Sequence, residues 1–82
     1  MKLVLVKWRD SQSYMDTAWF GKAEIKGKPG LIHSIGYVVE DTKDHICLIA
    51  DWDKAHDDQL GRHITIPKGC IKAIEQLKPI KP

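Results

Sequence analysis

The segment IPKGCI (66–71) places one cysteine between two lysines. Cys70 has Lys68 two residues before it and Lys72 two residues after it. A neighbouring cation stabilises a thiolate, so a reactive cysteine is one interpretation. A cysteine nucleophile also needs a positioned general base, and no Cys/His/Asp arrangement can be placed around Cys70. We therefore expect Cys70, like Cys47, to be a buried or half-buried apolar residue, and we expect no catalytic residues and no enzyme.

The segment DWDKAHDD (51–58) gathers four aspartates and one histidine, the side chains of a candidate cation site. The EF-hand pattern needs oxygen ligands at positions 1, 3 and 5, a glycine at position 6 and a glutamate at position 12. Counting from Asp51, these last three positions hold Ala55, His56 and Arg62. The pattern fails, so we expect a solvated hairpin tip and no metal. No phosphate-binding glycine loop or dinucleotide fingerprint is present, so no cofactor is expected either.

Aromatic side chains beside cations suit a nucleobase with its phosphate. Trp8 is followed directly by Arg9, and Tyr14 comes shortly after. In a small core the first role of a tryptophan is burial, which is the competing interpretation for Trp8, Trp19 and Trp52. The candidate ligand-binding residues are Trp8, Arg9, Tyr14, Arg62, His63 and Lys68.

Charge is divided unevenly along the chain, although the net charge is only +2. Residues 1–39 hold six Lys/Arg and three Asp/Glu, 40–58 hold two and seven, and 59–82 hold five and one. If the two basic ends lie side by side in the fold, the molecule has a basic face that can attract nucleic acid or nucleotides. An ordinary solvated surface with an acidic hairpin tip is the alternative.

The composition is that of one small globular domain. The 82 residues are 43% apolar and 29% charged, and there are two cysteines. We expect a single domain over 1–78 and a basic tail over 79–82. The apolar run near the N-terminus is shorter than the roughly 7–15 residues of a signal peptide, and no run could span a membrane. A cytoplasmic location, with reduced thiols and no membrane partner, is expected.

Short apolar runs separated by polar turns predict five strands. Residues 2–8, 31–40, 46–52 and 62–66 read as strands, and the second and third of them form a hairpin. On the third, Ile46 and Leu48 share a face, and on the fourth Ile64 and Ile66 point inward. His33 and His63 lie in predicted strands and are candidate neighbours across the sheet. Residues 16–25 are either a short helix or an irregular loop.

The segment 67–77 has two interpretations. Ile71, Ile74 and Leu77 are spaced by three, as on a helix face. Pro67 would then need Ile66 as its N-cap, and isoleucine is among the poorest caps. We favour a single 3₁₀ turn followed by the final strand: Pro67 ends the preceding ladder, Gly69 permits an unusual backbone angle, and Ile71 enters the core.

That ending resembles the last part of a small barrel of the Sm-like or Src-homology-three-like kind. The chain also looks like a group of small bacteriophage and prophage proteins over VKWRDS (6–11), HSIGYVVEDTKDHICLIADW (33–52) and ITIPKGCIKAIEQL (64–77). The resemblance implies an all-β fold, a five-stranded barrel with a 3₁₀ turn before the last strand. It brings no catalytic set with it.

Two functional hypotheses follow. The first is a non-enzymatic phage-type binding module that forms a homo-oligomer and holds nucleic acid or a nucleotide-like anion on a basic, aromatic face. The second is a protein–protein interaction module that binds and inhibits a host protein of an antiviral defence, in the host cytoplasm.

Overall fold

A computed structural model describes residues 1–10 and 30–78 of the chain. The helix or loop expected over 16–25, the residues Tyr14 and Trp19, and the tail 79–82 lie outside the described residues. The elements are β1 (Leu3–Asp10), β2 (Gly30–Asp41), β3 (His45–Asp53), β4 (Gln59–Pro67), the 3₁₀ turn η2 (Lys68–Cys70) and β5 (Ile71–Gln76). The expected all-β class is confirmed for this part of the chain.

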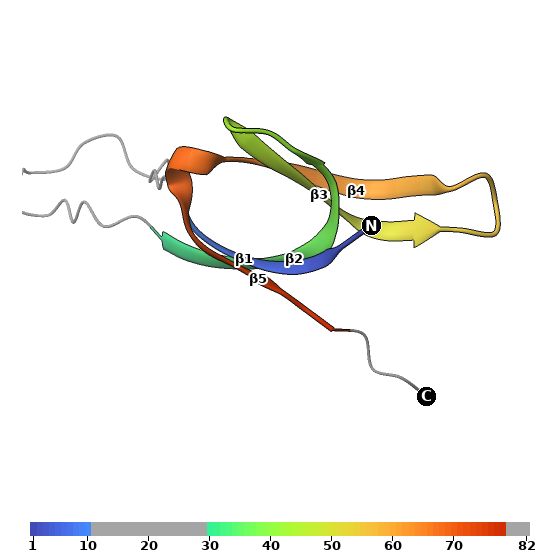
Figure 1. The fold of residues 1–82 in the computed structure, drawn as a ribbon, viewed down its shortest axis with the longest axis horizontal. Coiled ribbons are helices and arrows are strands. Elements are labelled where there is room, and N and C mark those ends of the chain that lie inside the picture. The colour runs from blue at the N-terminus through green and yellow to red at the C-terminus, as the bar shows by residue number, and fades with distance from the viewer. Residues whose placement is uncertain (11–29, 79–82) are drawn as a thin grey trace, which may run out of the picture.

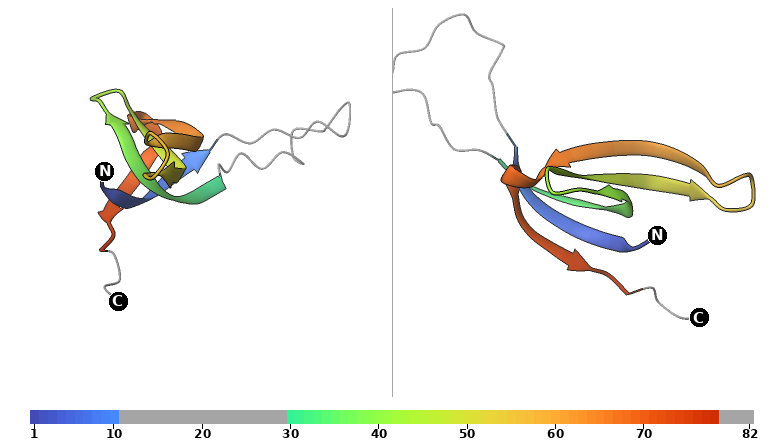
Figure 2. Two further views of the ribbon diagram at one scale, coloured as in Figure 1. Left: turned by 90° about the vertical axis from the view of Figure 1, so that its right-hand side faces the viewer. Right: turned by 45° about the horizontal axis from the view of Figure 1, so that its top comes forward.

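All five strands belong to one antiparallel sheet with the order β4-β3-β2-β1-β5. The sheet curls, so that β3 and β4 lie across from β1 and β5, and η2 joins the two edge strands (Figure 1). The sheet is not closed, because β4 and β5 are not paired with each other. Two further views show the same curl and the hairpin of β3 and β4 that extends from it (Figure 2).

A small apolar cluster lies on the concave side of the curl. It consists of Val4, Val6, Ile46, Leu48 and Ile66, with Trp8, Val38 and Ile71 packed against it. Alternate residues of a strand point to one face, which explains the spacing of two within β1 and β3. The predicted shared face of Ile46 and Leu48 is confirmed.

Ile64 and Ile66 both face the concave side, as expected, but only Ile66 is buried there. Ile66 is fully buried, whereas 38% of Ile64 remains exposed. Ile64 pairs with Leu48 on the concave side, but β4 is an edge strand and no neighbouring strand covers its outer flank. The burial of a side chain on an edge strand depends on the element that packs beside that strand. The alternation of apolar and polar residues does not predict that element.

β2 is shared between the two halves of the sheet. Its residues 30–37 pair with β1, and its residues 37–41 pair with β3, with a register shift between Val38 and Glu40. Gly36 stands at this transition and is buried. A Cβ atom on Gly36 would lie 2.8 Å from the carbonyl oxygen of Ile49 and 3.0 Å from Cβ of Leu48. Only glycine permits this approach of β2 to β3.

The corner after β4 has the predicted form, and the competing helix over 67–77 is wrong. Pro67 is extended at φ −62°, η2 spans three residues, and the Ile71 amide donates to the carbonyl of Lys68. The role expected of Gly69 is wrong, because no glycine described has a positive φ. The corner is fastened to the β2–β3 turn, since the Lys68 amide donates to the Asp44 carbonyl at 2.8 Å.

No helix in residues 1–10 and 30–78 is long and apolar enough to cross a membrane.

Gly36→Ala is expected to destabilise the protein by about 1–3 kcal/mol, because the new methyl group meets backbone that cannot move aside. Gly69→Ala is the matched control, since nothing lies within 4 Å of its added Cβ. Urea unfolding followed by circular dichroism would measure both. Equal stability of the two variants would contradict the close approach at Gly36.

Ile66→Ala is expected to cost about 2–5 kcal/mol, as for other large-to-small changes at fully buried sites. Ile64→Ala changes the same side chain on the same strand and should cost clearly less, because Ile64 is partly exposed. The difference between the two free energies of unfolding, from the same urea titrations, tests whether β4 is an edge in solution.

Candidate functional site

The six candidate ligand-binding residues do not form one site. Trp8 lies on the concave side of the sheet, where its indole N–H donates to the Ser34 hydroxyl at 3.0 Å and its ring packs against the core. Arg9, the next residue, is exposed. Successive residues of a strand point to opposite faces, so Trp8 and Arg9 cannot hold one ligand between them. Tyr14 lies outside the described residues.

Arg62 has its charge compensated by an aspartate. Its Nε and a terminal nitrogen donate to the two carboxylate oxygens of Asp51 at 2.7 and 3.0 Å. Arg62 has φ 53°, the left-handed region, and Ala50 and Arg62 are not paired although the residues on both sides are. The bidentate contact with Arg62 lowers the pKa of Asp51 despite partial desolvation, and raises that of Arg62. A planar guanidinium already held in this way has less capacity for an added anion.

Lys68 is similarly engaged, with its ammonium 2.6 Å from a carboxylate oxygen of Asp41. His63 is exposed on β4 opposite Ile49, and His33 lies on β2 opposite Lys7. Because β3 separates β2 from β4, the two histidines expected to be neighbours are not.

The acidic loop between β3 and β4 uses its polar groups internally. The indole N–H of Trp52 donates to Asp58 at 2.9 Å, and His56 contacts the Asp53 carboxylate at 3.0 Å. Asp57 and Asp58 both have positive φ, as expected of a tight hairpin tip. Within the described residues, no group of three or more His, Cys, Asp or Glu side chains could hold a metal ion.

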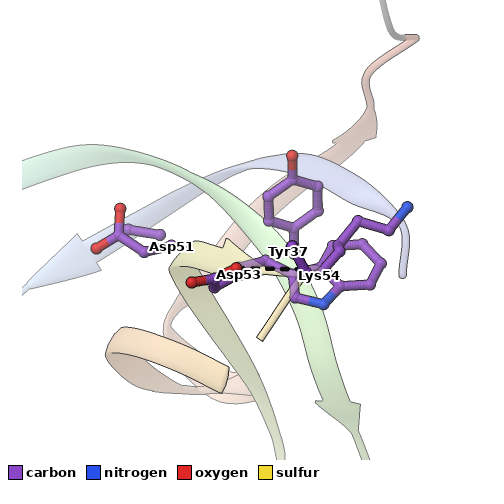
Figure 3. Close-up of a pocket in the computed structure, with 7 residues that line it drawn as sticks. Tyr37, Asp51, Asp53 and Lys54 are labelled. Atoms are coloured by element: carbon purple, nitrogen blue, oxygen red, sulfur yellow. Dashed lines mark hydrogen bonds between the residues drawn. The ribbon is translucent and has the colours of Figure 1, made fainter. Parts of the chain in front are cut away.

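An aromatic pair braces the base of this loop. The rings of Tyr37 and Trp52 meet edge to face at 5.3 Å, and the Lys54 ammonium lies 4.7 Å from the centre of the Trp52 ring. These residues line a shallow pocket in which Tyr37 and Lys54 lie together while Asp51 stands apart (Figure 3). The contacts stabilise the loop on β2, so the aromatic groups serve the fold at this position.

Two cationic side chains, Lys7 and Arg9, lie with His33 on the convex face of β1 and β2, which we call the outer face. Lys7 is directly opposite His33, and Arg9 is opposite Leu31. Further along, Leu5 is opposite Ile35 and Leu3 is opposite Tyr37. The outer face therefore has a cationic half and an apolar half. It is defined by Leu3, Leu5, Lys7, Arg9, Leu31, His33, Ile35 and Tyr37.

Both halves of the outer face are accessible. Ile35 is 62% exposed and Leu31 is 52% exposed. Among the residues that the structure describes, Lys7 has one counter-charge, Glu75 of β5, at 3.7 Å. Arg9 makes no ion pair with any of the residues that the structure describes. These cations can make charge-assisted hydrogen bonds to phosphate oxygens.

Sequence reasoning identified Arg9 and missed Lys7 and His33. Alternation places Lys7 and Arg9 on one face of β1, and it places His33 with Ile35 on one face of β2. Sequence reasoning could not supply the register of β1 and β2, which places Lys7 opposite His33. The two strands are separated by residues 11–29, too long a connection for turn chemistry to fix the pairing.

Comparisons of the chain with protein-family models, with curated proteins and with solved structures found no match.

The Asp51–Arg62 pair predicts a specific pH response. Because Arg62 lowers the folded-state pKa of Asp51, the pair contributes stability above the unfolded-state pKa, and this is lost as the pH falls through the folded value. Carboxyl ¹³C titration by NMR should place the Asp51 midpoint below that of an ordinary aspartate. In Arg62→Gln the midpoint should rise towards the ordinary value. The same midpoint in both proteins would show that the pair does not persist in solution.

Proposed function

We propose that the protein is a non-enzymatic phage-type binding module that holds nucleic acid or a nucleotide-like anion on the outer face of β1 and β2. The observation that supports this most is the juxtaposition of Lys7 and His33 across the two strands, with Arg9 beside them. The site differs from the one expected, because Arg62 and Lys68 make direct hydrogen bonds to carboxylates at 2.7 and 2.6 Å, whereas Glu75 is 3.7 Å from Lys7. Arg9 belongs both to the expected site and to the outer face.

The chemistry of the outer face supports binding without catalysis. Lys7, Arg9 and His33 can donate hydrogen bonds to phosphate oxygens, and the neighbouring apolar side chains can contact a base. Covalent catalysis would need a nucleophile with a hydrogen-bonded base. The outer face carries neither a cysteine nor a hydroxyl other than that of Tyr37, which packs on Trp52.

The finer fold we propose is a small barrel of the Sm-like or Src-homology-three-like kind. The order of the strands, the curl and the 3₁₀ turn between the edge strands support it. Ile64 and Ile74, on β4 and β5, are 38% and 43% exposed. Pairing of these edges between copies would cover them, and a homo-oligomer is proposed by fold-level analogy. A phage origin and a place in the host cytoplasm are part of this proposal and rest on the sequence resemblance.

A second candidate function, binding of a host protein, is favoured by a small apolar pocket beside β4. Its volume is about 260 Å³, and Val39, Ile49 and Leu60 are among its lining residues. Val39 and Leu60 are 44% and 46% exposed, and Ile49 beneath them is buried. A pocket of this size fits one apolar side chain of a partner, and exposed apolar groups of this kind mark interaction sites.

Arg9→Gln is expected to weaken binding of phosphate-bearing ligands about fivefold, which corresponds to roughly 1 kcal/mol for one lost hydrogen bond. Lys68→Gln makes the same change in net charge, but Lys68 is paired with Asp41, so its effect should be much smaller. Fluorescence anisotropy with labelled RNA, DNA and nucleotides at several salt concentrations would measure both variants. If the unaltered protein binds none of these probes in a salt-dependent manner, the proposed function is wrong.

A further inference from the structure

We infer that the convex side of β2 is a docking surface for a second copy of this chain, which packs against it face to face about a two-fold axis. This inference goes beyond the proposed function, in which copies associate through the edges of the sheet. Three features of β2 support it: an exposed apolar side chain, a pocket further along the strand, and charges of opposite sign towards its two ends.

The exposed apolar side chain is Ile35. It is 62% exposed, more than any other large apolar side chain in the described part of the chain. It stands opposite Leu5 on the outer face, between His33 and Tyr37. Folding of the described strands leaves most of this side chain in solvent, and exposed apolar groups that cluster on one face mark interaction sites.

The pocket beside β4 lies further along the same side of the sheet. Val39 and Leu60 are among its lining residues, with the buried Ile49 beneath them, and its volume is about 260 Å³. Ile49 pairs with Tyr37, so the pocket is on the convex side. Ile35 and Val39 are four residues apart, about 13 Å at the usual rise per residue. They cannot meet within one copy, but each can meet the other in a symmetric pair.

A two-fold axis that crosses β2 at Tyr37, in the plane between two copies, makes both contacts at once. The two β2 strands then run antiparallel, and Ile35 of each copy lies over Val39 of the other, at the wall of the pocket. In such an isologous contact one surface patch serves both copies, so an exposed side chain and a pocket on either side of the axis are both used twice.

The charges along β2 agree with the same axis. His33, with Lys7 opposite it on β1, lies four residues before Tyr37, and Glu40 lies three residues after it. Glu40 is on the convex side, because it pairs with Cys47 and not with a residue of the core. The antiparallel arrangement sets Glu40 of each copy against Lys7 and His33 of the other. A parallel arrangement would set like charges together, and charge complementarity of this kind fixes the register of an interface.

The contact is expected to be weak. The sheet is convex here (Figure 1), so two copies touch only near Tyr37. Lys7 and Glu40 each have one partner within their own copy, Glu75 and His45, and the Glu40 side chain is 58% exposed. Small interfaces of this type belong to transient complexes, so we expect a roughly micromolar or weaker dissociation constant. A second copy bound here also covers the cations of the outer face, so the dimer excludes the proposed ligand.

Sedimentation equilibrium of the full chain over a concentration series would measure the monomer–dimer equilibrium. Ile35→Ser should weaken dimerisation about 25-fold, because the change occurs twice in a symmetric dimer and each lost apolar contact is worth about fivefold. Ile74→Ser is the matched control. Ile74 is 43% exposed but lies on the edge strand β5, so this change should leave the dimer unaffected. Circular dichroism would check that both variants are folded.

Charge reversal tests the position of the axis. Glu40→Lys and Lys7→Glu should each weaken dimerisation severalfold, because each sets like charges together across the interface. The double variant should recover dimerisation, since the charges that meet are again opposite. Loss of the contacts that Lys7 and Glu40 make within one copy would not produce this recovery.

Three outcomes would overturn the inference. The first is a protein that stays monomeric at the highest concentration reached, which would leave this surface to another partner. The second is a dimer that Ile74→Ser weakens and Ile35→Ser does not, which would place association at the edges of the sheet. The third is a double charge variant that dimerises no better than the single variants. None of these results decides whether one copy binds phosphate-bearing ligands, which the anisotropy titrations test separately.

Discussion

The transition of β2 from one partner strand to the other determines the arrangement of the remaining strands. β2 pairs with β1 up to Tyr37 and with β3 from Tyr37 onward. At this point Gly36 lets the backbone of β3 come closer than any side chain would allow. A bent strand shared by two partners curls the sheet, as glycines do at the corners of small barrels. Val6 of β1 and Ile66 of β4, two strands that are not neighbours in the sheet, then meet in one core.

The same fold brings opposite charges from distant parts of the sequence together. Acidic residues of the middle section pair with cations from the last third of the chain, Asp41 with Lys68 and Asp51 with Arg62. The basic ends of the sequence do lie side by side, since β1 pairs with β5, but Glu75 of β5 faces Lys7 there. Among the strand residues that the structure describes, Arg9 of β1 and Lys72 of β5 are exposed cations without an ion pair. An uneven charge distribution in a sequence therefore indicates a basic face only after the ion pairs have been taken into account.

Local signals were sufficient for the strands and for the corner. Pro67 has no N–H to donate, so it ends the hydrogen-bond ladder of β4. The 3₁₀ turn and the strand β5 that follows it could therefore be predicted from residues near in sequence. The pairing of Lys7 with His33 could not, because it depends on strands separated by residues 11–29. The left-handed backbone conformation of Arg62 could not be predicted from the sequence either, because non-glycine residues adopt it rarely. In this structure it occurs together with the contact between Arg62 and Asp51. The exposure of Ile64 depends on whether the sheet closes, a property of the whole fold.

The edges of the sheet and its outer face are separate surfaces. The proposed assembly through the edges is therefore compatible with the proposed ligand on the outer face. The left-handed Arg62 interrupts the ladder of β4, and such irregularities restrict strand pairing at an edge. Association of copies would then involve the regular part of β4 after Arg62, together with β5. Such an assembly would leave Lys7, Arg9 and His33 exposed on every copy, because their side chains project from a face and not from an edge. Repetition of the outer face in such an assembly would strengthen the proposed binding, since linked weak sites together bind far more tightly than each binds alone.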